Sequence, residues 1–254
     1  MKILYLTPGC FDKGGISRYC RYQISALREI FGQEHVRVIS LLGPTKDSFE
    51  GNFDVLWAGT GNGFDQKTVL TAKVMKEILV WRPDVVHSAH VNFSGLSYIL
   101  AWLGGAKTVL NTYGLEVWSG LSWDAAYGLG KTDFIISDCH FTAEYLKNNC
   151  GRSTGTTKVI WDCVDLGKFS SGSSEVRVLT KYDIPDPDQF FNIMTLGRLS
   201  SGAAHKGYDR LLHIFAQISS KVSNARLVIV GSGDLLPVLK RLSEQLHIHA
   251  RVVF

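Results

Sequence analysis

The chain has 254 residues, 45% hydrophobic and 20% charged, with 27 lysines and arginines against 23 acidic residues and a formal net charge of +4 at pH 7. These values are typical of a soluble globular protein with one large domain or two modest ones. The mild charge lacks the strongly basic stripe of a nucleic-acid-binding protein, so we expect no nucleic-acid partner.

The sequence carries no predicted membrane span or secretion signal. The longest run without charge or histidine, residues 91–106, is shorter than the roughly 20 apolar residues that cross a bilayer, and we expect it to be a buried helix. The first six residues are too short for a signal and are predicted to form a strand. The cysteines are odd in number and form no CxxC pair, which favours reduced thiols in a cytoplasmic protein. They are Cys10, Cys20, Cys139, Cys150 and Cys163.

Short apolar strands alternate with helical patterns along the first two thirds of the chain. The predicted strands are residues 3–7, 36–42, 54–58, 84–87, 108–112, 133–137 and 158–161. Helical spacing marks, among others, residues 16–31, 66–81 and 141–149. This alternation indicates parallel βαβ units, so residues 1–169 are predicted to form an α/β domain with a doubly wound, Rossmann-like sheet. In such sheets ligands bind at the carboxyl ends of the strands.

The pattern lapses between residues 170 and 188, where serine, glycine, proline and aspartate predict a linker. It restarts with strands at 191–196, 226–230 and 251–254 and helices at 208–219 and 234–246. Residues 189–254 are therefore predicted to begin a second Rossmann-like domain. Three strands and two helices leave apolar faces uncovered, so we expect this domain to be incomplete.

The first candidate site follows the first strand. Gly14 and Gly15 precede a helix, where glycine lets a ligand approach the backbone and free N–H groups favour a phosphate. A plain tight turn is the alternative. The helix that follows is predicted to turn its polar residues to solvent: Arg18, Arg21, Ser25 and Arg28. The arginines there would suit an anionic acceptor or a peripheral contact with an anionic membrane, although a solvated helix face is the simpler explanation.

The second candidate site lies in the second domain. Arg198 follows a predicted strand and Lys206 precedes a predicted helix, so the two cations flank one loop. A diphosphate in that loop would meet both cations and the positive end of the helix. The position at a strand end favours this interpretation over two solvated surface charges.

Two further loops follow predicted strands. Gly231 and Gly233 could approach a base or ribose, or could form an ordinary turn. His87, His90 and the segment from Tyr113 to Glu116 follow the fourth and fifth strands, although a lone histidine is more often packed than catalytic. The sequence has no HExxH, no Cys/His ligand set and no acidic cluster, so no metal site is predicted.

Taken in order, these segments resemble the retaining glycosyltransferases of family 4, which have the GT-B fold of two Rossmann-like domains. The resemblance spans essentially the whole chain. In the first domain it rests on Gly14-Gly15 with Arg18, on residues 83–87 with His90, on 112–116, on 136–146 and on 159–169. In the second domain it rests on residues 197–199, 206–207 and 230–233.

The resemblance implies that the first domain holds the acceptor and the second holds a nucleotide-sugar. Arg198 and Lys206 would bind the donor diphosphate and stabilise the leaving nucleotide as its charge develops. Gly231 and Gly233 would belong to the same donor site, and the N–H groups of Gly14 and Gly15 would reach its phosphates. No metal or other cofactor would be required. The acceptor side would include Arg18, His87, Tyr113 and Glu116, with His90 as a catalytic candidate.

The sequence departs from the family pattern at several points. Tyr113 stands where a histidine is common, so no imidazole acts there. Residues 200–205 make the loop between the two cations longer than its commonest form, and Cys163 replaces a usual glycine. The acidic motif that the family uses on donor sugar and ribose is absent from residues 1–254, so the resemblance implies an incomplete catalyst.

We therefore predict a cytoplasmic hexosyltransferase that moves a sugar from a nucleotide-diphosphate-sugar donor to an acceptor with retention and releases the nucleoside diphosphate. The family serves polysaccharide, glycolipid and small-molecule pathways, so the acceptor is a glycan, a lipid-linked compound or a small molecule, and the enzyme would work in the cytoplasm or at the inner face of the membrane. The alternative is a non-catalytic nucleotide-sugar-binding or glycan-binding half-transferase that acts with a partner. A nicotinamide-dependent oxidoreductase is disfavoured because GxGxxG and an acidic residue after the second strand are missing.

Overall fold

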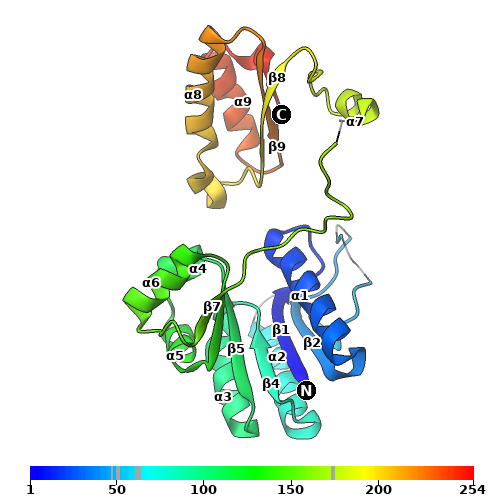
Figure 1. The fold of residues 1–254 in the computed structure, drawn as a ribbon, viewed down its shortest axis with the longest axis vertical. Helices are drawn as coiled ribbons and strands as arrows, with labels where there is room; N and C mark the ends of the chain where they lie inside the picture. Colours follow the sequence, from blue (N-terminus) through cyan, green and yellow to red (C-terminus); the bar gives the residue numbers. More distant parts are fainter. Residues whose placement is uncertain (47, 50–51, 61–63, 173–174) are drawn as a thin grey trace. The chain divides into compact units, whose positions relative to one another are not determined.

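Two parallel sheets organise the chain in the computed structural model, which describes residues 1–46, 48–49, 52–60, 64–172 and 175–254. The chain divides into two units, Met1–Leu166 and Gly167–Phe254, each with one of these sheets (Figure 1). The predicted linker, residues 170–188, falls in the second unit. It is not without structure, because Val176–Lys181 forms a short helix, α7.

The first unit has a seven-stranded sheet in the order β3-β2-β1-β4-β5-β6-β7, and all of its strand pairs are parallel. This confirms the predicted α/β class. The strands are β1 (Ile3–Gly9), β2 (Val36–Leu42), β3 (Trp57–Ala58), β4 (Val85–Ser88), β5 (Lys107–Thr112), β6 (Phe134–Ser137) and β7 (Thr157–Val159). The strand order reverses beside β1, and the crevice at such a switch point is the usual ligand site of an open α/β sheet.

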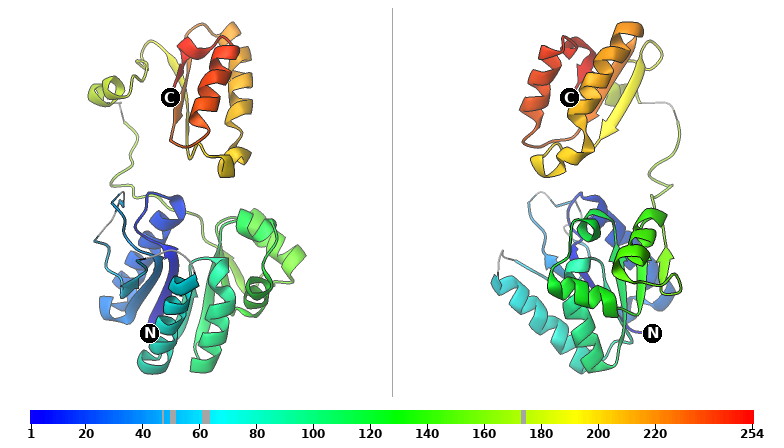
Figure 2. Two further views of the ribbon diagram at one scale, coloured as in Figure 1. Left: turned by 180° about the vertical axis from the view of Figure 1, so that it is seen from behind. Right: turned by 90° about the vertical axis from the view of Figure 1, so that its left-hand side faces the viewer.

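Helices cover both faces of this sheet because β1 is apolar on both sides. Successive strand side chains point to opposite faces. Leu4 and Leu6 pack in one core cluster with α2 (Phe64–Lys76) and α3 (Ser94–Gly104). Tyr5 packs in another cluster with α1 (Gly15–Phe31). Thus α1 covers one face, while α2 and α3 share the other (Figures 1 and 2).

The helix α5 (Trp123–Lys131) packs closely against α3 because two glycines meet at their crossing. A side chain on Gly128 would overlap the backbone of Ser94, and one on Gly95 would crowd Asp124. The Ser94 hydroxyl also donates a hydrogen bond to the Ala125 carbonyl at 2.8 Å. Two shorter elements, α4 (Leu115–Trp118) and α6 (His140–Cys150), follow β5 and β6.

Two predicted helices differ from expectation. The pattern at 66–81 forms α2 followed by a π-helical turn, η2 (Glu77–Trp81), which ends at Arg82 in the left-handed region. The helix predicted to be buried within 91–106 is α3, and the prediction of burial is wrong for its outer side. Only one side of α3 packs on the sheet, so Ile99, Trp102 and Leu103 remain 49%, 70% and 53% exposed.

The second unit has a three-stranded parallel sheet in the order β10-β9-β8. Its strands are β8 (Phe191–Leu196), β9 (Ala225–Val230) and β10 (Val252–Val253). The helices α8 (Tyr208–Lys221) and α9 (Leu236–Gln245) pack on this sheet around Leu212, Phe215 and Leu239. Met194 and Leu196 of β8 are exposed, so part of the sheet has no cover within the described residues.

Candidate functional site

The loop after β1 leads directly into the amino terminus of α1. Gly14 is the N-cap, in an extended conformation, and no side chain caps this end of the helix within the described residues. Asp12 Oδ1 instead accepts a hydrogen bond from the Gly14 N–H at 2.7 Å. A side chain built on Gly15 would meet no described atom within 4 Å. The fold therefore does not require glycine at 15, and the space beside it is open to a ligand.

Arg21 and Arg28 of α1 were predicted to face solvent. The prediction is wrong for Arg21, which is buried, and Arg28 is partly buried. Arg21 is 6% exposed and donates through Nη1 to the carbonyls of Cys10 and Asp12, at 2.7 and 3.0 Å. The Arg28 side chain is 13% exposed and lies 3.2 Å from an Asp54 carboxylate oxygen. The Phe49 ring lies 5.5 Å from the Arg21 guanidinium carbon. Arg21 therefore supports the glycine loop, while Arg28 is held by Asp54.

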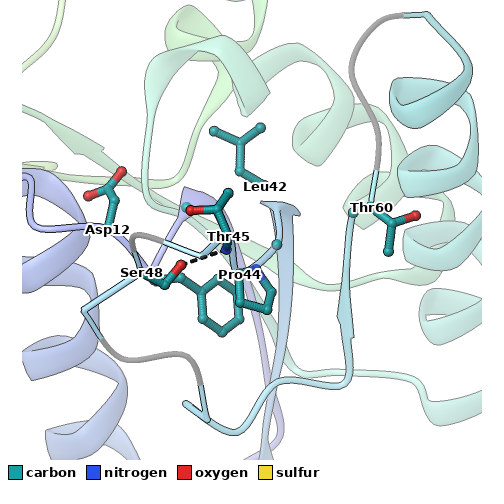
Figure 3. Close-up of a pocket in the computed structure, with 10 residues that line it drawn as sticks. Asp12, Leu42, Pro44, Thr45, Ser48 and Thr60 are labelled. Atoms are coloured by element: carbon teal, nitrogen blue, oxygen red, sulfur yellow. Dashed lines mark hydrogen bonds between the residues drawn. The ribbon is translucent and has the colours of Figure 1, made fainter.

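A pocket of about 400 Å³ lies beside this loop, at the carboxyl ends of β1, β2 and β3 (Figure 3). None of the sites predicted from the sequence includes this pocket. The Thr45 N–H donates to Ser48 Oγ at 2.7 Å and shapes one wall. Gly43 and Gly59 end β2 and β3 so close together that a side chain on Gly43 would overlap the Gly59 carbonyl. In the sequence, the glycines that follow these two strands could have pointed to the pocket. The lining residues are Gly9, Phe11, Asp12, Leu42, Gly43, Pro44, Thr45, Ser48, Gly59 and Thr60.

His87 lies in a buried polar network beneath α1. It is 5% exposed, its ring centroid is 4.7 Å from that of Tyr5, and its Nε2 lies 3.0 Å from Asn111 Oδ1. Burial lowers the pKa of His87 to about 4. Asn111 Nδ2 donates to Gln23 Oε1 at 2.6 Å and to the Tyr113 hydroxyl oxygen at 3.1 Å. The network thus joins β1, β4, β5 and α1, and His87 acts in it as a neutral packed group. Its acceptor-side role stays a prediction.

The turn after β5 is closed by Glu116. Its Oε1 accepts hydrogen bonds from the N–H groups of Tyr113 and Gly114, at 2.5 and 3.3 Å. Gly114 has a φ of 126°, which favours glycine.

The nearby His90 is half-buried, and its Nδ1 accepts a hydrogen bond from the Asn92 N–H at 3.2 Å. Burial lowers the pKa of His90, while the Glu116 carboxylate acts in the opposite direction.

These loops lie along one edge of the first sheet. They follow the carboxyl ends of β1, β4 and β5, which are aligned by the register of Leu6 with Ser88 and of Ser88 with Leu110. Gly14, Gly15, His90, Tyr113 and Glu116 therefore share the edge at which parallel sheets bind ligands.

In the second unit, Arg198 and Lys206 belong to one compact loop. The Leu199 N–H donates to the Ser232 carbonyl at 3.0 Å, and this bond fixes the chain after β8. Lys206 ends a 3₁₀ turn, η4 (Ser201–Lys206). A Cβ built on Gly197 would lie 2.9 Å from Lys206 Nζ, so the Lys206 ammonium folds back beside the residue that precedes Arg198. Both cations are exposed, and neither forms an ion pair within the described part of the chain.

Gly231 and Gly233 pack against this loop. A side chain on Gly231 would overlap the Gly197 carbonyl, and one on Gly233 would overlap that of Leu199. Asp234 Oδ1 accepts a hydrogen bond from the Ser201 N–H at 3.0 Å, which lowers the pKa of the carboxyl. The glycines thus have a packing role of their own, and Asp234 ties the 231–234 turn to the start of η4.

The described residues contain no group of three or more His, Cys, Asp and Glu side chains that could hold a metal ion. Over the same residues, no helix has the length and apolar character needed to cross a membrane.

Comparison with known proteins gives two family matches. The model described as Glycosyltransferase Family 4 matches residues 13–168, and that described as Glycosyl transferases group 1 matches residues 184–254. A curated relative is the GDP-mannose-dependent alpha-(1-6)-phosphatidylinositol monomannoside mannosyltransferase of Mycolicibacterium smegmatis, 25% identical over 158 residues. The match covers 59% of this chain and 39% of that relative.

Solved structures show the same fold at low sequence identity. HepE from Anabaena, in complex with UDP, is 16% identical with a TM-score of 0.77, and the match covers 100% of this chain and 68% of HepE. The lipopolysaccharide outer core galactosyltransferase WaaB, in its apo form, is 16% identical with a TM-score of 0.68, and the match covers 100% and 67% of the two chains.

Proposed function

The chain belongs to Glycosyltransferase Family 4, and we propose that it takes part in the transfer of a hexose from a nucleotide-diphosphate sugar to an acceptor, with retention of configuration. The observation that carries this proposal is the pairing of Arg198 and Lys206 on one loop, beside the amino terminus of α8. That loop lies in the segment matched by the group 1 glycosyltransferase model.

The donor diphosphate would bind at this loop. Arg198 offers planar N–H donors and Lys206 a compact ammonium, both suited to phosphate oxygens. Gly207 has a φ of 70° and turns the chain into α8, whose first N–H groups carry a partial positive charge. Breaking the sugar–phosphate bond places negative charge on the leaving nucleoside diphosphate. The cations therefore stabilise the transition state more than the ground state, without a metal ion.

The first unit would supply the acceptor side. Its carboxyl edge offers the uncapped start of α1, the open space beside Gly15 and the adjoining pocket. The pocket carries the Asp12 carboxylate and the hydroxyls of Thr45, Ser48 and Thr60, which are groups that bind sugar hydroxyls. His87 is buried at this edge, whereas His90 is only partly buried. His90 is therefore our candidate for proton transfer. Arg18 and Tyr113 complete the proposed acceptor side.

The relatives support a nucleotide-sugar donor and leave its base open. HepE has been solved with UDP and with UDP-glucose, and the mycobacterial relative uses GDP-mannose. The relative is named for action on a phosphatidylinositol monomannoside, which favours a lipid-linked acceptor over a free sugar here. A cytoplasmic location is compatible with either kind of acceptor. A non-catalytic nucleotide-sugar-binding or glycan-binding half-transferase that acts with a partner is the second candidate. The match with the curated relative spans 39% of that protein's length.

Turnover of the full-length protein separates the two candidates. Purified protein is incubated with UDP-glucose, GDP-mannose and ADP-glucose in turn, with a membrane lipid extract as acceptor source. Release of a nucleoside diphosphate is measured, and the anomeric configuration of the product is read by NMR. The proposal predicts release from one donor that depends on acceptor, and a product with the anomeric configuration of the donor. Donor binding without release under every condition would favour the half-transferase, and an inverted product would contradict retention.

A further inference from the structure

The outer surface of α2, η2 and α3 carries large apolar side chains that the fold leaves uncovered. We define this α2–α3 face by six exposed residues: Val69, Leu79, Val80, Ile99, Trp102 and Leu103. They are 43% to 73% exposed. Outer helices of a doubly wound sheet normally turn charged and polar residues outward. Here α3 contains no charged residue at all.

These residues lie on neighbouring elements. The inner sides of α2 and α3 pack in the same core cluster, against the same face of the sheet (Figure 1). A side chain on Gly104, at the end of α3, would come within 2.6 Å of Ile78 of η2, so the two elements touch there. Ile99, Trp102 and Leu103 follow the i, i+3, i+4 spacing that puts side chains on one side of a helix.

The α2–α3 face continues into a row of aromatic rings. Tyr98 lies four residues before Trp102 on α3, and its ring centroid is 5.7 Å from that of Tyr127 on α5. Tyr127 in turn stacks on Trp123, at 5.8 Å and an interplanar angle of 14°. Trp123 is 82% exposed. Tryptophan and tyrosine combine an apolar ring with a polar group, which suits the boundary between lipid and water.

Exposed cations outnumber exposed carboxylates on this face. Lys73 and Lys76 lie on the last turn of α2, and Arg82 ends η2; all three are exposed. The described residues 64–82 and 91–106 hold two carboxylates: Asp65 is exposed on the first turn of α2, and Glu77 is buried and lies 2.6 Å from Arg37 Nη1. Asp124, beside Trp123, is the exposed carboxylate at the aromatic end of the face.

We propose that the α2–α3 face binds the surface of an anionic lipid bilayer. Apolar and aromatic side chains would enter the boundary between head groups and acyl chains, and the cations would meet anionic head groups. A second copy of this chain is a poorer occupant, because a two-fold interface would bring the same lysines and arginine together. This inference concerns where the protein docks and is independent of the donor chemistry. It also places the membrane contact on the opposite face of the sheet from α1, the helix that carries Arg21 and Arg28.

Vesicle co-sedimentation tests this proposal with the full-length protein. The probes are vesicles of phosphatidylcholine alone and of phosphatidylcholine with phosphatidylglycerol. The wild type should bind the anionic vesicles more tightly, and added salt should weaken the binding. Trp102→Ser with Leu103→Ser should weaken it by on the order of tenfold or more, because two exposed apolar anchors are lost. Lys73→Glu with Lys76→Glu should weaken binding to anionic vesicles by at least about fivefold per lysine.

Ile214→Ser, on the exposed side of α8, is the matched control and should leave binding unchanged. If the Trp102 and Leu103 variant loses helical signal, Leu79→Ser with Val80→Ser takes its place. Failure of the wild type to sediment with either vesicle would overturn the proposal. So would binding that is equally strong in these variants. A wild-type dimer that Trp102→Ser converts to a monomer would assign the face to a second copy instead.

Discussion

At the scale of residues, Arg198 and Lys206 carry the proposed donor chemistry. Each charge-assisted contact to phosphate is worth about 1.5–3 kcal/mol, so Arg198→Ala or Lys206→Ala should reduce turnover by on the order of 10- to 100-fold. The loss should appear mainly in kcat, since the charge on the leaving diphosphate grows toward the transition state. Steady-state kinetics of the full-length protein measures this effect.

Lys221→Ala is the control for these variants, because Lys221 is an exposed cation at the far end of α8. It should leave kcat and KM unchanged. Thermal unfolding should show that all three variants remain folded. Wild-type kcat in both loop variants would mean that these cations are solvated surface charges.

His87 should make stability depend on pH. Its pKa is about 4 in the folded protein, whereas a histidine in an unfolded chain has its ordinary value near 6.5. Between these values the unfolded chain binds the extra proton, so the free energy of unfolding falls as pH falls from about 6.5 to 4. The shift corresponds to about 3 kcal/mol, which is fully present above the unfolded pKa.

Urea unfolding of the wild type and His87→Gln at several pH values measures this contribution. Glutamine can still donate to Asn111 but does not titrate, so the variant should lose less stability on acidification. His213→Gln, at an exposed position on α8, should behave as the wild type does. An identical pH dependence in His87→Gln and wild type would show that His87 is not held neutral by burial.

At the scale of elements, Arg21 fixes the loop that precedes α1. Its guanidinium donates to two loop carbonyls and is almost fully buried. Arg21→Met keeps the apolar stem but leaves both carbonyls without this donor, and should lower the free energy of unfolding by about 3 kcal/mol. Chemical denaturation measures the loss. Arg241→Met, at an exposed site on α9, is the control, and an equally small change in both proteins would contradict this role.

Most elements of the fold could be predicted from the sequence. The strands β2 and β8 have the predicted bounds. For β2 the reason is that a largely buried parallel strand is a nearly continuous apolar run. In contrast, β3 was predicted as residues 54–58 and pairs only at Trp57 and Ala58. The length of a paired strand depends on the length and position of the neighbouring strand, and an apolar run in the sequence does not specify either.

The candidate site was less predictable where it depends on tertiary contacts. Arg21 was expected on a solvated face because helix spacing alone places it there, but it is buried against the loop carbonyls of Cys10 and Asp12. The acceptor-side role of Glu116 stays a prediction, and the sequence did not indicate that its carboxylate caps the turn at Tyr113 and Gly114. The pocket is formed by loops that follow three different strands, so no single segment of the sequence predicts it. Loop positions at strand ends, including those of Gly14 and Arg198, followed from the alternation of strands and helices.

At the scale of the whole molecule, the two candidate sites belong to different units. The acceptor-side groups lie in Met1–Leu166, and Arg198 and Lys206 lie in Gly167–Phe254. The two family models each match one part of the chain. The central claim is therefore that the first unit binds the acceptor and the second unit binds the donor. This claim requires that a nucleoside diphosphate bind to the second unit.

Calorimetric titration with UDP, GDP and ADP tests that claim most directly. The wild type and the double variant Arg198→Ala with Lys206→Ala are compared in buffer with EDTA, so that binding by the cations is measured without divalent metal. At least one nucleoside diphosphate should bind the wild type, and the double variant should bind it more weakly by at least on the order of 100-fold. Binding that is equally tight in both proteins, or no binding of any of the three to the wild type, would contradict the assignment of the donor site.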